Sequence, residues 1–156
     1  MFLLTLKRMV WTGLLAMVPI FEVKGAIPFG QAVGLTPVQA YIAAIVGSTI
    51  MLTFLAYFWQ WFYAACKRRG RLKRFTGWMD KITHKNLPKW QKFGHWAIVG
   101  YVAMPVPGTG TWTGAIIACV LGMKPRKTIV SVFSGNLISA LIWSLASNGV
   151  LNAIGF

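Results

Sequence analysis

The stretch from Phe21 to Gly30, FEVKGAIPFG, constrains the fold most, because it interrupts an apolar run with charges and helix breakers. Glu22 is one of only two acidic residues in the chain, and apolar sequence flanks it on both sides. A charge at the centre of a bilayer costs about 2.5–3.5 kcal/mol on insertion scales. Gly25, Pro28 and Gly30 are expected to break the helix and free backbone groups that lipid cannot satisfy. Such a break beside ionisable groups typically lines a cavity, so the stretch predicts half of a functional site.

The composition indicates an integral membrane protein. The hydrophobic fraction is 56% and the mean hydropathy is +0.61, values outside the usual range of soluble domains. The net charge of +14 would suit a nucleic-acid partner, but the bases gather in loops between apolar runs, where membrane topology explains them. The sequence offers no Ser-His-Asp set, no acid pair and no cluster of metal ligands. We therefore predict neither an enzyme, nor a cofactor, nor a metal site, and no nucleic-acid partner.

The first apolar segment, Met9–Leu35, has two arms that are each shorter than the roughly 20 residues of a full membrane span. The segment therefore predicts a re-entrant hairpin with its bend at Glu22–Pro28. The N-terminus resembles a secretory signal peptide, but Glu22-Val23-Lys24 is a poor cleavage site, so we expect no cleavage there. Val38–Cys66 then runs apolar for long enough to cross the bilayer with some tilt.

The second broken segment begins with apolar Phe93–Met104 and continues into Met104–Gly114, which holds two prolines, three glycines and three threonines. That composition is incompatible with an uninterrupted helix. Residues 128–156 form a last apolar run that is long enough to cross once. Between the two halves, Lys67–Lys92 carries ten bases, and its apolar residues recur at helical spacing. This pattern predicts an amphipathic helix bound to anionic lipid head groups, or alternatively a solvated loop helix.

The two halves of the chain align at a constant offset of 88 residues. Matching pairs include Gly34 with Gly122, Pro37 with Pro125, Gly47 with Gly135, Ile50 with Ile138, and Val18-Pro19 with Val106-Pro107. The chain is thus predicted to be a single all-α membrane domain with repeat one at 1–66, a basic linker at 67–92 and repeat two at 93–156. Interrupted segments at corresponding positions of two repeats are typical of a transporter binding site.

The distribution of charge tests the orientation of the repeats. If both broken segments are hairpins, the linker and Lys124–Lys127 share one side, thirteen bases oppose Lys7 and Arg8, and the repeats are inverted. If the broken segments cross instead, the split is twelve against three and the repeats are parallel. Charge alone leaves both arrangements open, whereas the short arms favour hairpins. The excess of bases predicts a cytoplasmic linker in a prokaryotic plasma membrane, and we expect a homo-oligomer, a dimer.

Glu22–Pro28 and Met104–Gly114 resemble the two signature motifs of the small multidrug export proteins, and the Pro-x-Pro-Gly-Thr-Gly match is specific. That family is similar to the wider DedA (VTT-domain) superfamily, whose members carry two re-entrant hairpins that face each other inside the membrane. The family pattern usually has Arg where this chain has Lys24, which keeps the charge but loses a bidentate grip on phosphate. The resemblance implies transport of a lipid-linked phosphate, either a polyprenyl phosphate or a phospholipid, coupled to protons or sodium.

Roles for individual residues follow from this hypothesis. Glu22 is predicted to bind and release the coupling proton, because burial disfavours a charged carboxylate. Lys24 supplies the counter-charge to the phosphate, while glycines allow close approach and threonines supply hydroxyls. The predicted substrate-binding residues are Lys24, Gly25, Pro28, Pro105, Pro107, Gly108, Thr109, Gly110, Thr111, Thr113 and Gly114.

Three alternatives remain open from the sequence. The first is proton-coupled efflux of small cationic drugs, with Glu22 as the shared proton and cation site. The second is a membrane assembly or scaffold protein that transports nothing. The third concerns the residues alone: Glu22 and Lys24 could neutralise each other as a plain structural pair.

Overall fold

The computed structural model describes residues 2–68, 74, 77, 81, 94–106 and 108–154, and every regular element within them is helical. The helices are α1 (Phe2–Met17), α2 (Glu22–Ala32), α3 (Pro37–Arg68), a helix at residues 94–103, α5 (Thr111–Val120) and α6 (Pro125–Ile154). Helix α3, and α6 from Pro125 to Val150, are long and apolar enough to cross a membrane. The all-α class and the two long apolar helices are therefore confirmed. Most of the 67–92 linker, with its predicted amphipathic helix, lies outside the described residues.

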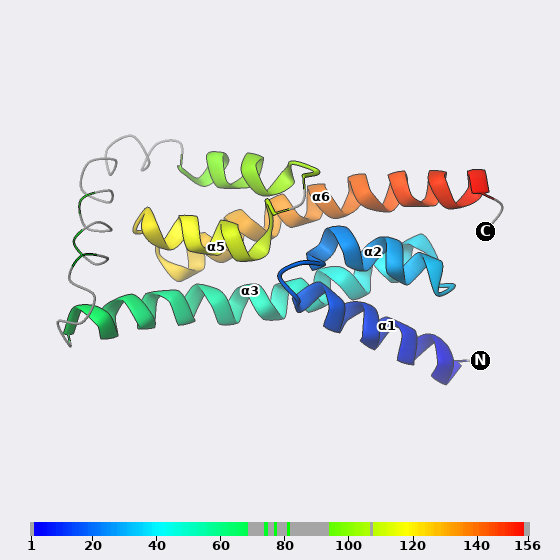
Figure 1. Cartoon of the computed structure of the whole chain (residues 1–156), viewed down its shortest axis with the longest axis horizontal. Helices are drawn as coiled ribbons and strands as arrows, with labels where there is room; N and C mark the ends of the chain where they lie inside the picture. Colours follow the sequence, from blue (N-terminus) through cyan, green and yellow to red (C-terminus); the bar gives the residue numbers. More distant parts are fainter. Residues whose placement is uncertain are drawn as a thin grey trace.

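Helices α1 and α2 form a first helical pair, which runs to the middle of the molecule and back (Figure 1). The bend lies at residues 18–21, so the predicted bend at Glu22–Pro28 is wrong. Pro19 explains the position, because proline cannot continue a helix and disfavours helical backbone in the residue before it. Helix α1 also begins at Phe2 and so includes Lys7 and Arg8, ahead of the expected start at Met9.

Helix α2 continues through Gly25, Pro28 and Gly30, which were expected to break it. Proline inside a helix removes one backbone hydrogen bond, but burial along α2 holds the helix together, since Val23, Ala26 and other side chains pack into a core under the first pair. The glycines do not bend α2; they let neighbouring helices pack closely against it. A Cβ placed on Gly30 would lie 3.0 Å from the Cβ of Ala40 and from Thr12 Oγ1.

The helix at 94–103 and α5 form a second helical pair, joined by the loop at 104–110 (Figure 1). The predicted interruption of the helix in this proline- and glycine-rich stretch is confirmed. Pro107 lies outside the described residues. A separate hydrophobic cluster lies under this pair, built from Ile98, Val102, Ala115 and residues of α3 and α6.

The same helix-ending turn occurs twice, 88 residues apart. After α2, Gly34 N–H bonds to Gln31 O and Leu35 N–H to Gly30 O; after α5, Gly122 N–H bonds to Cys119 O and Met123 N–H to Ala118 O. Gly34 and Gly122 have φ values of 88° and 70°, which a glycine adopts at no steric cost. Pro37 and Pro125 then open α3 and α6.

Helices α3 and α6 run in opposite directions along most of the length of the molecule (Figure 1). A glycine on each lets it approach the first helix of a pair: Gly47 meets the backbone of Gly13 in α1, and Gly135 meets Val99 and Val102. The end of α3, whose last turn holds Lys67 and Arg68, and the start of α6 lie toward the same end of the molecule (Figure 1). The chain's N-terminus and the end of α6 lie at the other.

Candidate functional site

The two helical pairs meet through polar contacts near the middle of the molecule. We call this contact the junction; it consists of Glu22, Lys24, Met104, Val106, Thr109, Gly110 and Trp112. The first two belong to α2, and the rest belong to the 104–110 loop and the first turn of α5. The stretches that the sequence predicted to meet do therefore contact each other.

Glu22 caps α5 from the opposite half of the chain. Gly110 is the N-cap residue of α5 and has no side chain that could accept a hydrogen bond from the exposed N–H groups. Trp112 N–H, at the N2 position, instead donates to Glu22 Oε1 at 3.2 Å. The carboxylate thereby occupies the place of an N-cap side chain, at the positive end of the helix dipole. Glu22 is 4% exposed, so this bond compensates part of the cost of burying a charge.

The backbone of Glu22 is also unusual. Among the described residues other than glycine, Glu22 alone has a positive φ, of 45°. An L-residue pays roughly 1–2 kcal/mol for this left-handed conformation. Strain of this kind persists where the surroundings fix it, and it concentrates at functional sites.

Lys24 reaches into the loop of the second half. Its ammonium donates to the carbonyl oxygens of Met104, Val106 and Thr109 and to Thr109 Oγ1, at 2.5–2.6 Å. The side chain is buried, at 7% exposure. The side-chain hydrogen bonds of Glu22 and Lys24 thus run to the opposite half of the chain and not to each other. Each charge is thus tied separately to the opposite half, and the hypothesis that Glu22 and Lys24 also neutralise each other as a structural pair stays a prediction.

Trp112 makes a third tie and was not among the predicted site residues. Its indole N–H donates to the carbonyl of Met17 at 3.1 Å, so the second pair also holds the tip of the first. Trp112 lies 88 residues after Lys24, and both side chains donate to backbone carbonyls of the opposite half. The 88-residue offset places Trp112 at the position equivalent to Lys24. The signal is weak in the sequence because lysine and tryptophan are chemically different residues.

Gly110 is required by the close approach of Glu22. A Cβ on Gly110 would overlap Glu22 Oε2 and would lie 2.5 Å from Glu22 Cδ. The two residues are also 88 positions apart, so equivalent positions of the two halves face each other. Any residue larger than glycine at position 110 would displace the carboxylate.

The threonines of the second motif hold the loop and the helix start. Thr113 Oγ1 accepts from Gly110 N–H at 3.1 Å and donates to Gly108 O. Thr111 Oγ1 accepts from Asn136 Nδ2 at 2.9 Å, which ties α5 to α6. Asn136 is buried and was likewise not predicted.

Other predicted residues lie away from the junction. Gly25 packs on Phe21, and Gly114 packs against Val102 and Val132 in the second core. Pro28 is six residues along α2, roughly 9 Å from Glu22 at 1.5 Å per residue. Gly108, with φ of 89°, and Pro105 are exposed in the loop.

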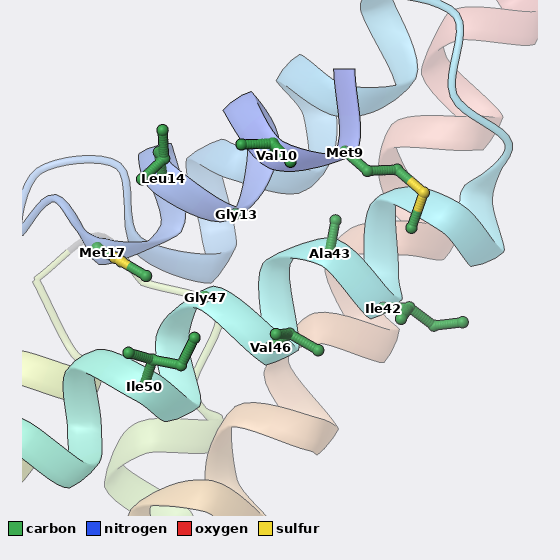
Figure 2. Close-up of a pocket in the computed structure, with 10 residues that line it drawn as sticks. All are labelled: Met9, Val10, Gly13, Leu14, Met17, Ile42, Ala43, Val46, Gly47 and Ile50. Carbon is green, nitrogen blue, oxygen red and sulfur yellow. The ribbon is translucent and has the colours of Figure 1, made fainter. Parts of the chain in front are cut away.

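An apolar groove of about 280 Å³ leads along the first half towards the junction. Figure 2 shows its walls on α1 and α3, which include Val10, Leu14, Val46 and Ile50, with Gly13 and Gly47 where the helices touch. Met17 lies at its inner end, and the Met17 carbonyl accepts the bond from Trp112. The apolar groove therefore adjoins, at Met17, a polar contact between the two halves.

Comparison with known proteins identifies one protein family. A model of the family described as "Putative small multi-drug export protein" matches residues 22–142, which is more than half of the chain and includes both sides of the junction. No curated protein and no solved structure matches the chain. The export family and the two long apolar helices together indicate a membrane protein of the transporter type. The chain belongs to the small multi-drug export protein family.

Proposed function

We propose that the protein transports a lipid-linked phosphate across the membrane, and that the junction is its gate. The observation behind this proposal is that two buried charges of the first half, Glu22 and Lys24, bind neutral groups of the second half. Glu22 and Lys24 bond to groups 80–90 residues away in sequence. Hydrogen bonds between halves can break and re-form, whereas interdigitated apolar side chains pack less reversibly.

The proposed architecture consists of two inverted repeats, each a re-entrant hairpin followed by a crossing helix, as in the DedA superfamily. Its support is the twofold recurrence of the turn before α3 and α6. The opposite directions of α3 and α6 in Figure 1 are those expected of inverted repeats. Alternating access would then be rocking of one repeat against the other about the junction.

The junction already holds one anion and one cation from the protein itself. The Glu22 carboxylate lies at the N-terminus of α5. The exposed N–H groups and the helix dipole at that end favour any anion, including a phosphate. A phosphate head group would take the place of the carboxylate and attract Lys24 away from its carbonyl partners. The prenyl or acyl chain would lie in the apolar groove that ends at Met17.

The family description favours another substrate, a small cationic drug, for which Glu22 would be the binding charge. Binding of a polyprenyl phosphate and of a quaternary ammonium dye to purified protein separates the two. For the phosphate, Lys24→Ala should weaken binding tenfold or more, and Glu22→Gln should preserve binding but abolish its pH dependence. For the dye, Glu22→Gln should abolish binding, and Lys24→Ala should leave it equal or stronger because like-charge repulsion is removed.

Lys127→Ala is the matched control, because it removes an exposed cation from the first turn of α6, outside the junction residues. It should leave binding of either ligand unchanged. If neither junction variant alters binding of the phosphate or the dye, neither side chain touches substrate. Transport of these ligands through the junction would then be rejected, and a scaffold role would be favoured.

We further propose a cytoplasmic linker at 67–92 in a plasma membrane, since thirteen bases lie at the linker end in the hairpin arrangement. In a variant without Cys66 and Cys119, a cysteine at position 86 should be labelled only after permeabilisation. A cysteine at position 152 should be labelled from outside intact cells. Equal labelling of both from outside would contradict the assignment.

A further inference from the structure

The four oxygens around Lys24 form a cage for a cation. Three are backbone carbonyls, of Met104, Val106 and Thr109, and the fourth is the hydroxyl of Thr109. All lie within 2.6 Å of one nitrogen, and all belong to a stretch of six residues. The amine has three hydrogens, so it cannot give each oxygen a hydrogen bond of its own. The arrangement resembles coordination of a positive centre more than a set of directed hydrogen bonds.

The chemistry of these oxygens selects for a single positive charge. All four ligands are neutral, whereas divalent calcium sites draw on carboxylates. Rings of neutral carbonyls bind monovalent cations in channels, and unwound backbone at the end of a helix coordinates sodium in transporters. The cage follows directly on the C-terminus of the helix at 94–103, the negative end of its dipole.

We propose that the carbonyl oxygens of Met104, Val106 and Thr109, with the Thr109 hydroxyl, form a binding site for a monovalent cation of the size of sodium. In this structure the ammonium of Lys24 occupies it. The inference rests on the proposed function in one respect, which is that an anionic substrate draws Lys24 out of the cage. A sodium ion then replaces the ammonium, so the loop keeps its positive centre while Lys24 binds the phosphate.

Exchange of this kind makes the binding of sodium and of substrate cooperative. Either ligand favours the state in which Lys24 has left the cage, so each raises the affinity of the other by the same factor. In the wild type, sodium alone should bind weakly because Lys24 competes for the oxygens. Polyprenyl phosphate should increase the binding of radioactive sodium, and sodium should increase binding of the lipid equally.

The cage can be tested without any substrate in the variant Lys24→Ala. The melting temperature of purified protein is measured in sodium chloride and in choline chloride at equal concentration. A ligand that binds only the folded state stabilises it by mass action, so sodium should raise the melting temperature of Lys24→Ala by about 5 °C or more. Wild type and Lys127→Ala should melt at the same temperature in both salts. Adding Thr109→Val to Lys24→Ala removes one oxygen and should reduce the shift.

An equal melting temperature of Lys24→Ala in sodium and choline would overturn the proposal. Recovery of the folded variant in sodium but not in choline would support it, since the ion restores the lost ties. Failure to recover the variant in any cation would count against it. A sodium shift without lipid binding would retain the cation site and reject the proposed substrate. Lipid binding without a sodium shift would reject the cation site alone.

Discussion

Gly110→Ala is expected to destabilise the protein by about 2–4 kcal/mol and to stop transport. A methyl group at position 110 overlaps Glu22 Oε2, so the carboxylate must leave the N-terminus of α5. The loss combines the cost of overpacking, about 1–3 kcal/mol, with that of a helix cap, about 1 kcal/mol. Backbone strain does not contribute, because Gly110 has an extended φ of −148°. Melting of purified protein in detergent measures the stability, and uptake into proteoliposomes measures the transport.

A double-mutant cycle shows whether the clash with Glu22 is the cause. Glu22→Ala removes the overlapping carboxylate, so Gly110→Ala should cost much less in that background, with a coupling energy of about 1–3 kcal/mol. Gly100→Ala is the matched control, since nothing lies within 4 Å of a Cβ there. It sits inside a helix and should be neutral or stabilising by up to about 1 kcal/mol. Additive effects of the two substitutions would mean that Gly110 is needed for another reason.

Gly47→Ala is expected to cost about 3 kcal/mol or more, because the obstacle is backbone and not the end of a side chain. A Cβ at Gly47 would overlap the carbonyl oxygen of Gly13 and lie 2.7 Å from its carbon. Helices α1 and α3 would have to separate, which opens the floor of the apolar groove. For a chain of this size, a loss of 3 kcal/mol corresponds to a melting temperature lower by about 6–12 °C.

Alanine at the other glycine of this contact, Gly13, provides the comparison. Gly13→Ala meets a single atom, Ala43 O at 3.2 Å, so a small shift accommodates it. The expected order of destabilisation is Gly47→Ala, then Gly13→Ala, then the control Gly100→Ala. Equal melting temperatures for Gly47→Ala and Gly100→Ala would show that α1 and α3 do not touch at these glycines.

Local chemistry determined the elements that the sequence predicts well. Helix ends depend on nearby residues, so Gly34, Pro37, Gly122 and Pro125 placed the turns before α3 and α6. Two long apolar runs were sufficient to identify the two helices that can cross a membrane. The break at 104–110 followed from its prolines and glycines. The bend in the first pair was also signalled locally, by Pro19, but the charged stretch beside it was mistaken for the bend.

The tertiary structure alone decided how the junction is built. Helix α2 keeps its course through Pro28 because burial of its side chains outweighs the local cost. The carboxylate of Glu22 caps a helix that starts 89 residues later, and Lys24 binds oxygens that point together only because the loop folds back. Trp112 bonds to a carbonyl of the opposite half. No pattern within a window of the sequence encodes these partners, because they come from the packing of one half on the other.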